Sequence, residues 1–135
     1  MTSELTVKVS PGELVDRISI SELRVSRLTD PDKVVKVHAE CMELRRTWED
    51  SGIPYGHLGP EIMRLWRELH DINLKGWGLE DRVRAMESIG DYGTVYIESC
   101  RAIHRNNDQR SATKRAINDL VGSEAVEEKI HGGAS

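Results

Sequence analysis

The sequence contains no phenylalanine, and aromatic residues make up only 4% of its 135 residues. It has no apolar run near the roughly 20 residues that a membrane helix needs, and its first residues lack the basic and apolar regions of a signal peptide. Its two cysteines, Cys41 and Cys100, follow no metal-binding spacing. A net charge of −4 argues against a dedicated nucleic-acid binder and against a basic membrane anchor. These absences predict a cytoplasmic protein with free thiols and no membrane contact.

The composition that remains suits slender helices. Apolar residues account for 38% of the chain and charged residues for 31%. Amphipathic helices with much surface for their volume have this balance, and a chain of this length fits one domain. The sequence therefore predicts a single all-α domain over residues 1–135.

Helix start signals occur at four places. Ser10 can cap a helix that opens with Pro11, and Thr29 or Asp30 can cap a second that opens with Pro31. A third follows Gly59-Pro60-Glu61, and Asp91 is available to cap a fourth. The expected helices are residues 11–28, 31–48, 60–89 and 93–121. Gly122-Ser123 is expected to close the last one, with a short terminal helix beginning there as an open alternative.

Apolar residues repeat at alternating three- and four-residue steps within each predicted helix, as in helices that pack along heptad-like seams. Short turns then make neighbouring helices antiparallel. The expected fold is an elongated bundle of two antiparallel helical hairpins, residues 10–50 and 60–121, joined by a loop at 51–59 and followed by a tail at 122–135.

The third helix contains the motif NLKGWGLEDRVR, in which Gly76 and Gly78 flank Trp77. The apolar pattern keeps its phase through both glycines, which predicts one continuous helix although each glycine costs about 1 kcal/mol relative to alanine. Gly76 stands where an apolar seam residue is due, so a bulky partner or a ligand is expected to approach the backbone there.

The short turn between the third and fourth helices also predicts a contact map, because facing residue numbers should add to about 181. The expected facing sets are Gly76 and Trp77 with His104 and Arg105, Asn73 with Asp108, Asp71 with Arg110, and Glu68 with Lys114.

The segment LTVKVS alternates apolar and polar residues as a strand does, yet no second strand pattern occurs in the chain. Residues 1–9 are therefore expected to form an extended arm, which either lies on the bundle or pairs with another copy or a partner chain.

Five motifs occur in a fixed order: VSPGELVDRISISELR, NLKGWGLEDRVR, GDYG, RNNDQRSATKRAIN and GSEAVEEK. Together they resemble a domain-of-unknown-function family of short helical proteins from bacteria and phages, sometimes found beside surface-polysaccharide glycosyltransferase genes. The family pattern has its characteristic residues on the third and fourth helices: Asn73, Trp77, Glu80, Asp81, Arg84, Asn107, Asp108, Arg110, Lys114 and Asn118. The family implies no established reaction, so the resemblance supports the fold more than the function. The sequence departs from that family at Gly76, where the family has a larger apolar residue, and after Glu-Glu-Lys, where an aromatic residue is missing.

The same residues form a polar network in the predicted seam. Burying Arg110 and Lys114 between helices would cost several kcal/mol each without carboxylate partners. Asp71, Glu80, Asp81 and Asp108 are the expected counter-charges, with Asn73 and Asn118 completing hydrogen bonds. Such a network either fixes helix register or, with His104 and Arg105, binds an anionic or sugar-phosphate group on which Trp77 can stack.

A different interpretation comes from four carboxylates in the order ExxE then ExxD: Glu40, Glu43, Glu68 and Asp71. This order resembles the magnesium-binding signature of all-helical nucleoside triphosphate pyrophosphatases, in which Mg²⁺ activates water. Glu43 and Asp71 lie off the predicted seams, where solvated charge is the simpler account. No other metal or cofactor is indicated.

The patterns together favour a binding or assembly module over an enzyme, linked to surface-polysaccharide synthesis by the resemblance alone. A homodimer or a protein partner is also expected, because a slender bundle leaves apolar stripes uncovered. The residues expected on that stripe are Ile20, Leu23, Trp48 and Trp66.

Overall fold

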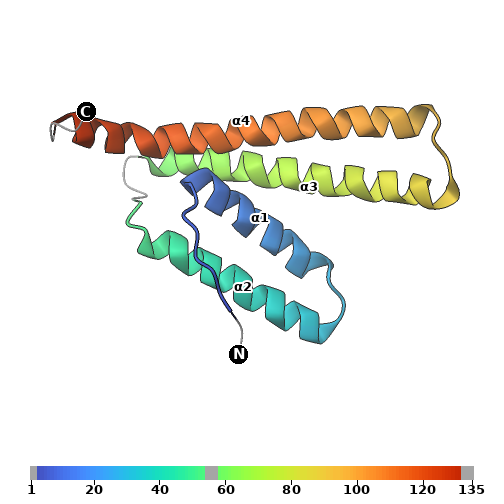
Figure 1. Cartoon of the computed structure of the whole chain (residues 1–135), viewed down its shortest axis with the longest axis horizontal. Coiled ribbons are helices and arrows are strands. Elements are labelled where there is room, and N and C mark those ends of the chain that lie inside the picture. The colour runs from blue at the N-terminus through green and yellow to red at the C-terminus, as the bar shows by residue number, and fades with distance from the viewer. Residues whose placement is uncertain (1–2, 54–57, 132–135) are drawn as a thin grey trace.

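The computed structural model describes residues 3–53 and 58–131, and beyond Gly122 it describes the backbone only. Within these ranges the regular structure consists of four helices (Figure 1): α1 (Pro11–Arg27), α2 (Pro31–Asp50), α3 (Gly59–Ile89) and α4 (Thr94–His131). The all-α prediction is confirmed. No helix in the described part of the chain combines the length and apolarity needed to cross a membrane.

The helices begin close to the predicted start signals. The Ser10 hydroxyl accepts a hydrogen bond from the Glu13 amide (3.2 Å), and the Asp30 carboxylate accepts one from the Asp32 amide (3.1 Å). These side chains satisfy amide groups that the first turn of a helix leaves without partners. Asp91 has a different role from the one expected, because its carboxylate accepts from the Gly93 amide within the turn before α4.

The end of α4 differs from the prediction. The helix continues through Gly122 to His131, so the expected tail at residues 122–135 is wrong as far as His131. Gly122 keeps a negative φ and does not form a left-handed cap. One glycine costs a helix only about 1 kcal/mol, too little to end it. Residues 132–135 lie outside the described part, as do residues 54–57 of the expected loop.

Helix α3 is continuous through Gly76 and Gly78, as predicted. It ends at Gly90, which adopts φ 70° and lets the chain reverse, and the Asp91 amide donates back to the Met86 carbonyl. A left-handed residue at this position favours glycine because it has no Cβ. The tight turn returns the chain as α4.

Figure 1 shows two antiparallel hairpins, α1–α2 and α3–α4, with the second extending well beyond the first. α1 packs against α2, α3 and α4. It starts beside α4 and runs obliquely away from the long hairpin. The predicted pair of hairpins is therefore confirmed, and α1 is the helix that joins them.

A hydrophobic core lies where all four helices meet. Ile18 on α1, Leu69 on α3 and Ile117 on α4 are almost completely buried, and Trp48 brings α2 into the same cluster. The Trp48 and Trp66 rings meet edge to face, with centroids 5.1 Å apart. The core also contains Leu14, Val15, Leu58, Ile62 and Leu65.

The apolar stripe expected to form a dimer face is largely covered within the chain itself. Leu23 is 5% exposed and Trp48 is 2% exposed, and Ile20 and Trp66 are half-buried. The reason is the oblique path of α1, which buries residues on more than one of its faces. This stripe therefore gives no argument for a second copy.

A polar joint and a cleft between α1, α3 and α4

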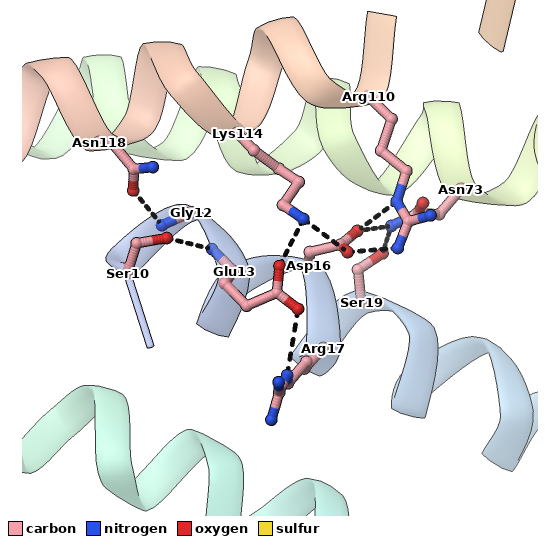
Figure 2. A network of polar contacts seen from close by, with 10 residues as sticks. All are labelled: Ser10, Gly12, Glu13, Asp16, Arg17, Ser19, Asn73, Arg110, Lys114 and Asn118. Carbon is pink, nitrogen blue, oxygen red and sulfur yellow. Dashed lines mark hydrogen bonds and ion pairs between the residues drawn. The ribbon is translucent and has the colours of Figure 1, made fainter. Parts of the chain in front are cut away.

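Asp16 is the most deeply buried charged residue of the joint between the hairpins, with 1% of its surface exposed. It lies on α1, and its carboxylate points towards α3 and α4 (Figure 2). Transferring an unpaired carboxylate to such a place would cost several kcal/mol. Its hydrogen-bond partners therefore decide whether α1 can dock here.

The main partner is Arg110 on α4. Its Nε donates to Asp16 Oδ1 (3.0 Å) and its Nη2 donates to Asp16 Oδ2 (2.5 Å), which makes a two-point ion pair. On the other side, Asn73 Nδ2 of α3 donates to Asp16 Oδ1 (2.9 Å) and lies 3.2 Å from the Ser19 hydroxyl. One carboxylate thus ties α1 to both helices of the long hairpin.

Lys114, one turn further along α4, connects to the same group. Its ammonium lies 3.7 Å from Asp16 Oδ2 and donates to the Glu13 carboxylate. Glu13 is also held by Arg17 on its own helix (3.2 Å). The two cations of α4 are thus matched by two carboxylates of α1, in the arrangement drawn in Figure 2.

These contacts set the ionisation of the joint. Burial alone would raise the pKa of Asp16, but hydrogen bonds from Arg110 and Asn73 and the nearby positive charges outweigh it, so the pKa lies below the ordinary value of 3.8. The Lys114 hydrogen bond lowers the pKa of Glu13 below 4.5. The hydrogen bond to Asp16 raises the pKa of Arg110. All three groups are charged at neutral pH.

The first turn of α1 lies directly against α4. The Gly12 amide donates to Asn118 Oδ1 (2.7 Å), so α4 supplies a cap for a helix start about a hundred residues earlier. A Cβ on Gly12 would lie 2.3 Å from the Lys114 carbonyl oxygen. Only glycine permits this approach of the two backbones.

Beside the joint, a cleft of about 230 Å³ opens where α1 diverges from the long hairpin. Since one water occupies about 30 Å³ of the liquid, the cleft has room for roughly eight waters. Its walls come from three helices: Ile20 and Leu23 of α1; Asn73, Gly76, Trp77, Glu80, Asp81 and Arg84 of α3; and Ile103, Asn106, Asn107 and Arg110 of α4.

Gly76 is explained by Asn106, the α4 residue that faces it. Asn106 Nδ2 donates to the Ile72 carbonyl of α3 (3.0 Å), and a Cβ on Gly76 would lie 2.7 Å from that nitrogen. The missing side chain lets the amide reach the α3 backbone. The predicted close approach occurs, but with Asn106 in place of His104 or Arg105, which are both exposed.

The other end of the Asn106 amide has no partner among the described residues. Asn106 is 5% exposed, and its Oδ1 is buried without a hydrogen bond. An acceptor left in this state costs about 1–3 kcal/mol. Rotating the Asn106 side-chain amide by 180° would remove the hydrogen bond from Nδ2 to the Ile72 carbonyl. The unpaired oxygen is therefore not explained by a reversed amide.

Trp77 forms the aromatic part of the cleft wall. The guanidinium of Arg27, in the last turn of α1, lies 5.3 Å from the centroid of its ring, within the range of a cation–π contact. One face of the indole is therefore occupied by α1. The half-buried ring also borders the cleft.

The structure divides the predicted site residues into three groups. Seven of them border the cleft: Asn73, Trp77, Glu80, Asp81, Arg84, Asn107 and Arg110. Lys114 and Asn118 lie instead at the first turn of α1. His104 and Asp108 are exposed and take no part in either place.

Several expected pairings are wrong. Asn73 bonds Asp16 and not Asp108, and Arg110 pairs with Asp16 and not Asp71. Glu68 pairs with Arg64 of its own helix (2.6 Å), away from Lys114. The expected counter-charges Glu80, Asp81 and Asp108 are exposed. The carboxylates come from α1, which the two-helix map did not include.

The proposed magnesium site is contradicted. Among the described residues, no three His, Cys, Asp or Glu side chains come together in a way that could hold a metal ion. Glu40 and Glu43 border a hollow between α1 and α2 with Arg17 and Arg24. Glu68 and Asp71 lie on α3, which α2 does not pack along. Asp71 borders other hollows than Glu40 and Glu43 do, so the four carboxylates do not share one site.

One serine–histidine contact also occurs. Ser19 Oγ lies 2.9 Å from His70 Nδ1, a distance at which a base can activate a nucleophile. Ser19 is completely buried, and its oxygen also bonds Asn73. With no route for a substrate to Ser19, the contact helps to hold α1 on α3.

Asp16 and Glu13 are the important residues that the sequence interpretation missed. A signal was present, because Gly12, Asp16, Ser19 and Leu23 follow the same three-four alternation as the apolar seam beside them. This second stripe, with small and polar residues, marks the face of α1 that docks on the long hairpin.

Comparison of the chain with models of protein families, with curated proteins and with solved structures found no match. The fold and the geometry of the cleft therefore carry the functional interpretation. The family resemblance of the motifs stays a prediction.

Proposed function

We propose that the protein is a non-enzymatic binding module whose cleft between α1, α3 and α4 takes one small, hydroxyl-rich ligand of the size of a single sugar ring, with or without a phosphate. The observation that carries the proposal is Asn106, a residue of the cleft wall whose buried Oδ1 has no hydrogen-bond partner in the described part of the chain. A ligand hydroxyl or N–H that reached it would recover the free energy that the unpaired acceptor costs.

The chemistry of the walls supports this ligand class. Glu80, Asp81 and Asn107 offer exposed acceptors and amide donors, Arg84 offers charged donors, and Trp77 offers an aromatic surface. Planar polar groups beside an aromatic ring suit a molecule that has hydroxyls and C–H faces. The volume is below the 300–1,000 Å³ or so of pockets for drug-sized molecules, which favours a single ring.

The charge balance favours the sugar part of the ligand over a free anion. Asp16 engages Arg110, and Glu13 engages Lys114, so neither cation is left as an open phosphate site. Within the cleft wall Arg84 is accompanied by Glu80 and Asp81. A phosphate bound here would depend on Arg84 and on the outer side of Arg110.

The expected cytoplasmic location belongs to the same proposal. Cys41 and Cys100 are both free thiols, which suits a reducing compartment. The link with surface-polysaccharide synthesis rests on the family resemblance, and a sugar ligand would strengthen it.

The test is a titration of the ¹⁵N-labelled protein followed by NMR of the tryptophan indoles. The probes are glucose, glucose 1-phosphate and inorganic phosphate at about 10 mM, which would load a site with Kd of about 1 mM. We expect the Trp77 indole signal to shift, while those of Trp48 and Trp66, which lie in the core region, stay in place. No shift with any probe would contradict the proposal, and a shift with inorganic phosphate alone would replace the sugar by an anion.

A variant pair ties the binding to the unpaired acceptor. Asn106→Leu removes the orphan oxygen and should weaken binding about tenfold or more, because a lost hydrogen bond to a buried group is worth about 1–3 kcal/mol. Gln109→Leu makes the same amide-to-leucine change at an exposed position of α4 outside the cleft and should bind as the parent does.

A further inference from the structure

The N-terminal arm, residues 3–9, is extended and open. Leu5 is 93% exposed and Val7 is 68% exposed, and in the described structure no backbone hydrogen bond reaches these residues. Figure 1 shows the segment as a thin coil that leads into α1 and belongs to no sheet. Of the two roles expected for the arm, burial against the bundle does not occur.

Two features of the arm are unfavourable in water. Its backbone amides and carbonyls are open on both edges, and its apolar side chains lie in water. Such an edge is a template for pairing with another strand. The alternation of Leu5, Val7 and Val9 with Glu4, Thr6 and Lys8 gives the strand one apolar and one polar face.

We propose that residues 3–9 pair with the same segment of a second copy of this chain as an antiparallel two-stranded ribbon centred on Thr6. In that register Leu5 of one copy faces Val7 of the other, and Glu4 faces Lys8, at both ends of the ribbon. Opposite charges and apolar pairs directly across an antiparallel ribbon stabilise it.

The charge pattern selects the partner and the direction. A parallel ribbon in the same register would place Glu4 against Glu4 and Lys8 against Lys8, and like charges directly opposite are destabilising. A strand from another protein would need a lysine and a glutamate at the matching positions. The arm is self-complementary at its inner positions, so a second copy supplies both the Glu4–Lys8 and the Leu5–Val7 pairs, and only Ser3 opposite Val9 is left unmatched.

The strength of the association follows from its length. A two-stranded ribbon is marginal in water by itself, and seven residues bring few pairs together. The dimer should therefore form reversibly as the concentration rises, and the cleft should stay open in both copies, because the arm contributes no residue to it.

The experiment measures the dimer Kd of the full chain by sedimentation equilibrium for a set of charge variants. Glu4→Lys and Lys8→Glu each place like charges opposite one another at both ends, and each should weaken the dimer about tenfold. The double variant exchanges the charges and should restore the parent Kd. Lys75→Glu, the same charge change at an exposed position of α3, should leave the Kd unchanged.

Crosslinking tests the register. In a Cys100→Ser background, Thr6→Cys places one thiol opposite its own copy, at the Cβ separation of about 4.5–5.5 Å found in cross-strand pairs, and should crosslink under mild oxidation. Leu5→Cys faces Val7, and its two thiols are separated by a diagonal of about 7–8 Å, so it should crosslink poorly.

The outcomes are distinct. A monomer at every accessible concentration overturns the proposal, and so does a dimer that is insensitive to the two charge reversals. A Leu5→Cys yield equal to that of Thr6→Cys overturns the register. Since the arm is exposed, the variants should keep the circular dichroism spectrum of the parent, which separates lost pairing from lost folding.

Discussion

Helices α1 and α2 both begin with a capping side chain followed by a proline and have nearly the same length, yet they pack differently against the rest of the protein. α1 buries eight residues on several faces, among them Asp16 and Gly12, whereas α2 buries only Val37, Cys41 and Trp48. α2 packs along α1 through one stripe, and α1 packs against every other helix. A small or charged residue on α1 therefore has a partner that it must fit, and a similar residue on α2 mostly faces water.

The largest effect is expected where the ion pair of α1 is broken from the α4 side. Arg110→Met leaves the buried Asp16 carboxylate without its two-point partner and should lower the free energy of unfolding by about 3–5 kcal/mol. Lys114→Met, whose ammonium lies 3.7 Å from Asp16 and otherwise bonds the partly exposed Glu13, should cost about 1 kcal/mol or less. Urea denaturation measures both.

The double variant Asp16→Leu with Arg110→Met sharpens this test. Replacing both partners by apolar residues leaves no buried charge, and it should recover most of the stability lost in Arg110→Met. Equal losses in Arg110→Met and Lys114→Met would show that Arg110 is not the main partner of Asp16.

The second effect compares matching positions at the two helix starts. Gly12→Ala would place a methyl group 2.3 Å from the Lys114 carbonyl oxygen, and the backbones must separate, at a cost of about 1–3 kcal/mol. Asp32→Ala, at the second residue of α2, loses only a favourable charge in the first turn, worth about 0.3–1 kcal/mol. Thermal unfolding should rank the two variants in this order, and a tolerated Gly12→Ala would contradict the close contact with α4.

Acid should weaken the joint by less than the loss of Arg110, because a protonated carboxyl keeps its shape. The folded-state pKa values of Asp16 and Glu13 lie below their ordinary values of 3.8 and 4.5. The stabilisation is therefore complete above the ordinary values and is lost as the pH falls through the lowered ones. Urea denaturation from pH 7 down to pH 2 should show this loss, and Asp16→Asn should flatten the curve; parallel curves for the two proteins would contradict the role of Asp16.

The smallest effects are expected within α3, at two glycines that lie two residues apart. Gly76 faces Asn106 of α4, whereas Gly78 faces open space. Gly76→Ala collides with Asn106 and should destabilise by about 1–2 kcal/mol. A Cβ on Gly78 meets nothing within 4 Å, so Gly78→Ala should stabilise by up to about 1 kcal/mol. In an Asn106→Ala background Gly76→Ala should stop destabilising, and a persistent loss there would contradict the assignment of Asn106 as the obstacle.

The helices and hairpins could be predicted because the signals for them are local. Ser10 and Asp30 cap the helices that follow them, and apolar steps of three and four residues identify each helix. A tight turn at Gly90 fixes the antiparallel register of α3 and α4. Each of these signals lies within a few residues of the structure that it determines.

The site was only partly predictable because its contacts are distant in the sequence. Asp16 and Arg110 are separated by 94 positions, and no local turn determines how one hairpin docks on the other. The expected pairs of facing residues on α3 and α4 were nearly right, but a shift of one residue along α4 rotates a side chain by about 100° about the helix axis. That rotation turns His104 and Arg105 outwards and Asn106 towards Gly76.

The hydrogen bond from Gly12 to Asn118 has a consequence for biosynthesis. The Gly12 amide in the first turn of α1 has its acceptor, Asn118 Oδ1, 106 residues later in the chain. The ribosome therefore synthesises the acceptor long after the donor. A ribosome that has released α1 and α2 has not yet made Arg110 or Lys114, so a nascent hairpin that buried Asp16 would carry an uncompensated charge. Docking of α1 is thus delayed until most of the chain has been synthesised, and translation arrested before α4 should yield a protease-sensitive chain.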